Sequence, residues 1–161
     1  MAGQSGSAAE RLYVERLYLL ILTDIELSYD DYLEDFYIGF FEMEQEAIET
    51  AEYYLHNVKG FCDFPCKYRI LPKEIEGIPE IANRNEIDRI WLIQGWDVNE
   101  NLDEVHMVES NCFVTKEGAE KGLSAMREHC VRDEWAVSCW TVGERGWREG
   151  FCRMVNGRSI N

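Results

Sequence analysis

Two stretches of the sequence, 72 residues apart, decide the predicted fold. Residues 36–58 read FYIGFFEMEQEAIETAEYYLHNV, and residues 108–130 read VESNCFVTKEGAEKGLSAMREHC. Few residues are identical, but the apolar positions stay in register, so that Phe41 aligns with Phe113 and Ala47 with Ala119. Self-similarity at a fixed period predicts two copies of one structural unit. The alternative is that two amphipathic stretches align by chance.

Both copies have the same predicted order of elements: strand, strand, helix, strand. Short apolar runs predict buried first strands, and stretches rich in aromatic and β-branched residues predict second strands that form hairpins with the first. Third strands close the copies. The strands are expected at residues 17–22, 36–41 and 67–71 in the first copy, and at residues 90–96, 105–114 and 135–142 in the second.

Each predicted helix has an apolar stripe with three- and four-residue spacing. The stripe runs from Ala47 to Val58 in the first copy and from Ala119 to Cys130 in the second. Acidic residues occupy the other face of the first helix, and Thr115 is the expected N-cap of the second. These patterns indicate helices that each bury one face against a sheet.

The pattern therefore predicts an α+β protein, a tandem duplication of a ββαβ unit with small antiparallel sheets each covered by one helix. The proline-containing stretch 72–85 is the expected connector, and both termini are expected to be mobile. The expected divisions are a tail at 1–10, a first unit at 11–78, a second unit at 79–155 and a tail at 156–161.

Four short motifs stand out along the two copies. They are Ile38-Gly39-Phe40-Phe41, the acidic helix start at residues 44–47, the turn Gly60-Phe61-Cys62-Asp63-Phe64-Pro65, and the closing Trp147-Arg148-Glu149-Gly150-Phe151. Together they resemble a family of uncharacterised bacterial ββαβ domains. The closing motif is reduced to Glu76-Gly77-Ile78 in the first copy, and the turn is missing from the second. The resemblance implies the fold, and it implies no activity because that family has none assigned.

The charge balance excludes several classes of protein. The 161 residues include 31 acids and 16 bases, which give a net charge of −15. Such a charge argues against direct binding to nucleic-acid phosphates or to an anionic membrane surface. The sequence has neither a run of about 18 apolar residues that could span a membrane nor a secretion signal at its start. We therefore expect a cytoplasmic protein.

The acids are concentrated in a window without a single Lys or Arg, between Arg16 and Lys59. Interleaved tyrosines and carboxylates favour a non-catalytic surface that engages a basic protein partner, as inhibitors, immunity proteins and nucleic-acid mimics do. The alternative is a solvated face that only keeps the protein soluble. The predicted partner-binding residues are Asp24, Glu26, Asp30, Asp31, Tyr32, Glu34, Asp35, Glu44, Glu49 and Glu52.

Two stretches of the sequence have part of the spacing of a metal site. Asp24, Glu26, Ser28 and Asp30 have the spacing of an EF-hand loop, but Tyr29 stands where the loop needs glycine. A zinc site would combine Cys62 and Cys66 with His56, or Cys130 with His129, without completing four ligands. We therefore expect no metal or cofactor, and free thiols.

The remaining candidates concern ligands and catalysis. Trp96 and Trp147 are expected to be the exposed pair among five tryptophans, all of which lie in the second copy. The alternative function is a small-molecule or metal-binding regulatory domain that uses a groove between the copies. Enzymatic activity is not expected, because the sequence has no phosphate-binding loop, no nucleophile elbow and no catalytic cysteine signature. The oligomeric state stays open.

Overall fold

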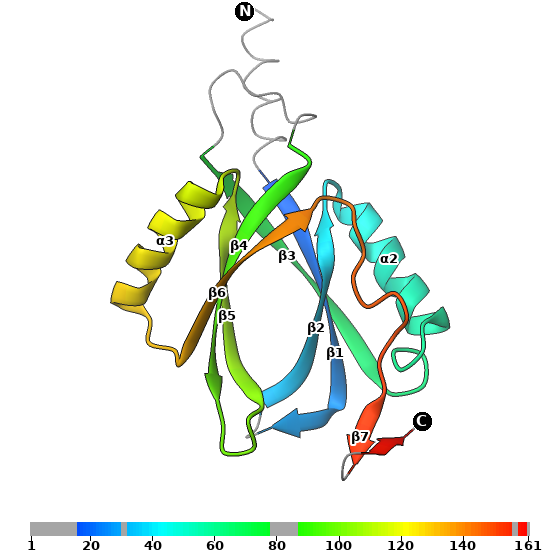
Figure 1. Cartoon of the computed structure of the whole chain (residues 1–161). Coiled ribbons are helices and arrows are strands. Elements are labelled where there is room, and N and C mark those ends of the chain that lie inside the picture. The colour runs from blue at the N-terminus through cyan, green and yellow to red at the C-terminus, as the bar shows by residue number, and fades with distance from the viewer. Residues whose placement is uncertain (1–15, 30–31, 78–86, 156–157, 161) are drawn as a thin grey trace, which may run out of the picture. The chain divides into compact units, whose positions relative to one another are not determined.

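The computed structural model describes residues 16–29, 32–77, 87–155 and 158–160. These residues form an α+β fold, which confirms the predicted class (Figure 1). The chain divides into two compact units, which are described separately below. Among the described residues, unit A contains those within Tyr18–Leu71 and Gly143–Asn161, and unit B contains those within Pro72–Val142 together with Arg16 and Leu17.

The elements follow the predicted order twice, strand, strand, helix and strand, before a short C-terminal hairpin. They are β1 (Arg16–Tyr29), β2 (Tyr32–Phe41), α2 (Glu44–Asn57), β3 (Cys66–Glu76), β4 (Arg89–Val98), β5 (Glu104–Phe113), α3 (Lys116–His129), β6 (Glu134–Thr141), β7 (Arg153–Val155) and β8 (Arg158–Ile160).

Hydrogen bonds connect six strands in the order β2-β1-β3-β5-β4-β6. The pairs β1–β2, β4–β5 and β4–β6 are antiparallel, whereas β3 and β5 are parallel. The prediction of separate, purely antiparallel sheets is therefore wrong. Its cause is β3, which continues past the end of unit A. Residues 66–71 belong to unit A, whereas Ile75 and Glu76 pair with Cys112 and Phe113 of β5 inside unit B.

The two sets of elements correspond at the predicted period. Both ends of α3 lie 72 residues after the ends of α2, and both ends of β5 lie 72 residues after those of β2. The strand orders also correspond, because the first strand of each set lies between the second and the third, as β2-β1-β3 and as β5-β4-β6.

The core of unit A forms between α2 and the strands β1 and β2. Ala47, Ala51, Tyr54 and Val58 are buried, which confirms the predicted stripe on α2. Two alanines in this stripe allow the helix to approach the sheet closely. The apolar side chains packed with the stripe are Leu20, Leu22, Phe36, Ile38, Phe41, Phe61 and Phe151. Each large apolar side chain buried here contributes about 1.5–3 kcal/mol.

The segment 143–151 completes unit A, although the sequence assigned it to the second copy. The N–H of Gly143 donates to the carbonyl of Phe40 at 2.8 Å, and that of Gly146 donates to the carbonyl of Ile38 at 2.6 Å. Both acceptors belong to β2, whose outer edge would otherwise expose its hydrogen-bonding groups. In Figure 1 the segment, drawn in orange, runs past β2 and α2.

The motifs that carry the family resemblance meet along this segment. A side-chain carbon added at Gly39 would collide with the carbonyl oxygen of Glu144, and one added at Gly150 would collide with the carbonyl of Lys59. At Gly60 an added carbon would lie 2.5 Å from the carbonyl oxygen of Phe151. The closing motif therefore packs against the motifs of the first copy, which itself lacks a full closing motif.

Unit B is organised around β4 and α3. The hydroxyl of Thr115 accepts a hydrogen bond from the N–H of Gly118 at 3.0 Å, which confirms the predicted N-cap. Gly122 lies where an added side-chain carbon would come within 2.6 Å of the Phe113 ring and 3.2 Å of Ile93. This close approach packs α3 against β4 and β5.

Several predicted boundaries differ from the structure. The expected connector begins at Pro72, but β3 continues to Glu76, with Pro72 exposed where a strand tolerates a missing N–H. β1 extends to Tyr29. The predicted strand ends at residue 22, because the acidic second half of β1 has the sequence pattern of a loop. The expected tail 156–161 contains β8, whereas the expected tail 1–10 lies outside the described residues.

Candidate functional site

Asp24, a predicted partner-binding residue, is fully buried in unit A. Its carboxylate accepts hydrogen bonds from Arg153 Nε at 2.8 Å and Nη2 at 2.6 Å. The N–H groups of Glu26 and Leu27 donate to the same carboxylate at 3.1 and 3.2 Å. Burial raises the pKa of Asp24, but these hydrogen bonds and the charge of Arg153 together outweigh burial and hold the pKa below its ordinary value. Asp24 is thus a structural carboxylate with no access to a partner.

Arg153 also contacts two other residues of unit A. Its guanidinium donates to Glu26 Oε1 at 3.3 Å and lies 3.8 Å from the centre of the Phe64 ring, in a cation–π contact. The charge of Glu26 is therefore partly neutralised. No local pattern in the sequence indicates this arginine, because it lies 129 positions from Asp24.

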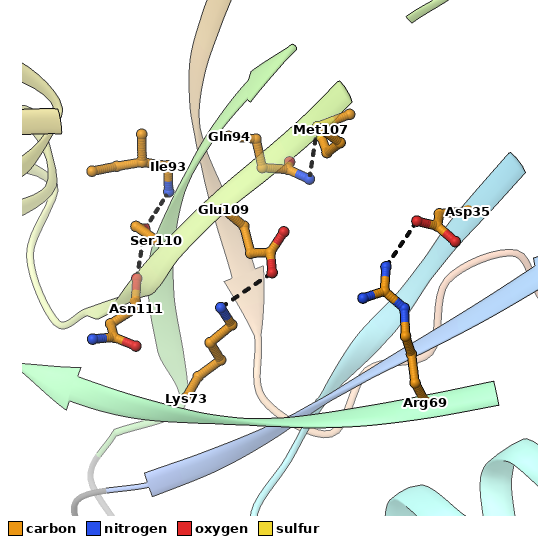
Figure 2. Close-up of polar contacts among 9 residues, drawn as sticks. All are labelled: Asp35, Arg69, Lys73, Ile93, Gln94, Met107, Glu109, Ser110 and Asn111. Atoms are coloured by element: carbon orange, nitrogen blue, oxygen red, sulfur yellow. Dashed lines mark hydrogen bonds and ion pairs between the residues drawn. The ribbon is translucent and has the colours of Figure 1, made fainter. Parts of the chain in front are cut away.

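Asp35 is neutralised in a similar way. Its carboxylate accepts a hydrogen bond from the Thr23 hydroxyl. It also forms an ion pair with Arg69 Nη2 at 2.8 Å (Figure 2). Its side chain is only 11% exposed, and that of the neighbouring Glu34 is half-buried. These two residues of β2 are therefore poorly placed to meet another protein.

Three further predicted residues lie outside the described part of the structure, wholly or by their side chains. Asp30 and Asp31 fall in the gap between β1 and β2. Tyr32 begins β2, but its side chain is not described. The predicted role of these residues therefore stays a prediction.

Four exposed carboxylates of unit A lie close together on α2. The acidic face of α2 consists of Glu44, Glu46, Glu49 and Glu52, all exposed. Within the described ranges, none of the four has a Lys or Arg within ion-pair distance, and Glu49 accepts only a hydrogen bond from Gln45 at 3.3 Å. Tyr53, 55% exposed, extends the same side of the helix.

Sequence reasoning selected three of these glutamates and missed Glu46. The signal that could have found it is its spacing, since Glu46 and Glu49 are three residues apart and lie on one helical face. The corresponding positions of α3 carry a different charge: Lys116 aligns with Glu44, and Lys121 with Glu49. The acidic face therefore belongs to one helix of the pair.

The two tryptophans predicted to be exposed differ in their surroundings. Trp147 is 48% exposed and meets the Phe36 ring edge to face, with ring centres 4.9 Å apart. Its backbone has a φ of 54°, in the left-handed region that non-glycine residues rarely occupy. Trp96 is half-buried in β4. Trp147 belongs to unit A, although the sequence places it in the second copy.

Unit B contains a small polar cluster of its own. Lys73 and Glu109 form an ion pair at 3.2 Å with side chains 13% and 14% exposed (Figure 2). At a nearby irregularity in the β4–β5 pairing, the hydroxyl of Ser110 accepts from the N–H of Ile93 at 3.0 Å and donates to the carbonyl of Asn111 at 2.6 Å. Each of these contacts satisfies a polar group that the sheet would otherwise bury without a partner.

The residues with metal-site spacing do not form a metal site among the described residues. Among the described residues, no group of three or more His, Cys, Asp or Glu side chains could hold a metal ion. Burial and the nearby charge of Asp24 raise the pKa of the half-buried Cys66 to about 11. His56 Nδ1 donates to the carbonyl of Glu52 at 2.7 Å. Asp24, the first residue with the EF-hand spacing, has its carboxylate in an ion pair with Arg153.

The two helices are 14 residues long, and over the described ranges neither is long and apolar enough to cross a membrane. No protein-family model matches the chain, and no curated protein or solved structure is significantly similar to it.

Proposed function

We propose that this chain is a non-catalytic, cytoplasmic protein-binding module whose acidic face of α2 engages a basic protein partner. One observation carries the proposal: Glu44, Glu46, Glu49 and Glu52 are exposed and form no ion pair with Lys or Arg among the described residues. By contrast, Asp24, Glu26 and Asp35 of β1 and β2 form ion pairs with Arg153 or Arg69 of the same chain. The proposed surface is therefore narrower than the acidic window of the sequence.

The arrangement suits electrostatic recognition. Four carboxylates lie within three turns of one helix, where they create a negative potential that speeds encounter with a Lys- and Arg-rich surface. The exposed Tyr53 adds an aromatic side chain of the type that contributes strongly to protein interfaces. A nucleic-acid-binding protein offers the matching basic surface, so the proposed mechanism is steric and electrostatic blockade.

We further infer that the chain arose by duplication of a ββαβ unit and that the acidic face is not a requirement of the fold. The matching bounds of α2 and α3 support the duplication. Lys116 and Lys121 support the second point, because α3 folds with bases at positions where α2 has glutamates.

The proposal is tested by charge reversal on α2. A variant with E44K, E46K, E49K and E52K is immobilised beside the wild-type chain, and proteins captured from cell extract are identified by mass spectrometry. We expect the wild type to retain a basic protein that elutes with rising salt, and the variant to lose it. The salt dependence follows because charges more than about 8 Å apart at physiological ionic strength are screened.

The matched control reverses three exposed acids of α3, in the variant E117K, E120K and E128K. It should retain the partner, because these acids belong to unit B. Equal loss from both variants would show that only net charge matters, and capture by the α2 variant at the wild-type level would refute the proposed surface. Both variants should unfold near the wild-type temperature, since all seven substituted side chains are exposed.

A further inference from the structure

A pocket of about 590 Å³ lies within unit A, between the C-terminal end of α2 and the segment 143–148. Its walls include Tyr53, Asn57, Lys59, Arg145 and Arg148. The volume falls in the range of about 300–1,000 Å³ that is typical of small-molecule sites. It includes none of the four glutamates of the acidic face, although it shares Tyr53 with the proposed partner-binding surface.

The pocket is positively charged in a chain whose net charge is −15. Three cationic side chains line it, and Glu144 is the only acid among its lining residues. No carboxylate among the described residues lies within ion-pair distance of Arg145 or Arg148. Burial raises the pKa of Tyr54, and the charges of these two arginines act in the opposite direction, which reflects their closeness to its phenol.

Other side chains hold the segment 143–148 against α2 and satisfy a carbonyl in the last turn of the helix, so the arginines are not needed for either task. The hydroxyl of Tyr54 donates to the carbonyl of Gly146 at 2.7 Å and so fixes the segment against α2. The carbonyl of Tyr53 accepts from Asn57 Nδ2 at 3.0 Å, so a side chain of α2 itself satisfies a carbonyl of the last turn. The negative end of the helix dipole stabilises Arg145 and Arg148, which have no carboxylate within ion-pair distance among the described residues.

We propose that this pocket binds a small phosphate-bearing molecule with a planar ring, of the nucleoside phosphate class. Arginine guanidinium groups match the geometry of phosphate oxygens and form charge-assisted hydrogen bonds with them. The exposed ring of Tyr53 offers a face on which a planar group can stack. The phosphate therefore lies between Arg145 and Arg148, and the ring lies toward α2. The inference shares only Tyr53 with the proposed partner-binding surface, and its test depends on Arg145 and Arg148, which lie outside that surface.

The test uses the full chain and AMP as the probe, followed by amide NMR. We expect saturable shift changes confined to residues 53–59 and 143–148. Adenosine, which lacks the phosphate, should bind at least roughly tenfold more weakly, since it forgoes the charge-assisted hydrogen bonds. Absence of saturable changes up to about 10 mM AMP, or equal binding of adenosine, would overturn the proposal.

Variants separate the pocket from general electrostatic attraction. The double variant R145Q/R148Q should lose at least roughly tenfold in affinity for AMP. The control K121Q/R127Q removes the same charge from exposed positions of α3 and should bind AMP as the wild type does. Equal losses in both variants would overturn the proposal. If R145Q/R148Q does not fold, R148Q alone provides the comparison, with the same requirement that it bind more weakly than the control.

Discussion

Arg153 binds the buried carboxylate of Asp24 through two hydrogen bonds, at 2.8 and 2.6 Å, across 129 positions of sequence. The contact ties the C-terminal hairpin to the middle of β1 within unit A. It also removes a carboxylate from the acidic surface that the sequence suggests. Because Asp24 is fully buried, its charge depends on this arginine and on two backbone N–H groups.

The substitution R153M should therefore destabilise the protein. It leaves the Asp24 carboxylate buried without its cation, and breaking a buried ion pair from one side costs about 3 kcal/mol. Urea denaturation measures the free energy of unfolding. The control R127M removes an exposed arginine of α3 and should change that free energy by less than about 0.5 kcal/mol. Similar values for the two variants would contradict the structural role of Arg153.

The same ion pair predicts a dependence on pH. The pKa of Asp24 is lowered in the folded protein, so its stabilisation is complete above the unfolded value of about 3.9 and is lost as the pH falls through the lower folded value. The difference in unfolding free energy between the wild type and D24N should be constant from about pH 6 to 8 and should shrink below about pH 4. A difference that grows on acidification would show that the folded pKa is not lowered.

Gly39 should tolerate no side chain. In G39A the new methyl group meets the backbone carbonyl of Glu144, which cannot move away without releasing the segment from β2. Overpacking of this kind costs about 2 kcal/mol, and limited proteolysis should cut the segment 143–151 faster than in the wild type. The control E144A removes the exposed side chain but keeps the carbonyl, so its stability and cleavage rate should match those of the wild type.

Neutralising part of the acidic face of α2 should increase stability. Glu49 lies three residues from both Glu46 and Glu52, so the glutamates repel one another along the helix. E49Q/E52Q should raise the free energy of unfolding by about 0.5 kcal/mol at low salt, and the gain should fade near 0.5 M NaCl as charges become screened. Thermal melts at the two salt concentrations measure the effect. A loss of stability at low salt would mean that these carboxylates make stabilising contacts.

The thiols should differ sharply in reactivity. Burial raises the pKa of Cys112 to about 12, and burial together with the charge of Asp24 raises that of Cys66 to about 11. At pH 8 these two cysteines should react with iodoacetamide roughly 100-fold more slowly than the exposed Cys62 and Cys139. Peptide mass spectrometry after timed quenching measures the rates, and uniform reactivity in the native protein would contradict the burial of Cys112.

Local patterns predicted the helices well. The stripe Ala47, Ala51 and Tyr54 is buried because apolar residues at three- and four-residue spacing fall on one face of a helix. The Thr115 cap was predictable for a similar reason, since a hydroxyl just before a helix satisfies a free N–H. Both features depend on residues within a few positions of one another.

Long-range contacts were not predictable from such patterns. The apolar character of Phe151 indicates burial, but nothing near it in sequence indicates that its ring stacks on Phe36, with ring centres 4.5 Å apart. The sequence also did not predict that β3 continues through Pro72. Proline is compatible both with a connector and with a strand residue that donates no hydrogen bond.

In the candidate site, too, local features were predictable and long-range contacts were not. Counting acids located an acidic region, but it could not show that Arg69 and Arg153 neutralise Asp35 and Asp24. The pocket at the end of α2 was missed altogether. Its cations come from sequence positions 59, 145 and 148, and only the folded chain brings them together.

The divided make-up of unit A has a consequence during synthesis of the protein. A ribosome makes β1, β2 and α2 first, then all of Pro72–Val142, and only afterwards the segment that carries Phe151. The core between α2 and the first two strands thus lacks the contacts of Phe151 until that segment is made. A product terminated after Val142 would leave Phe36 and Phe61 without Phe151, and exposed apolar surface of this kind attracts chaperones and promotes aggregation.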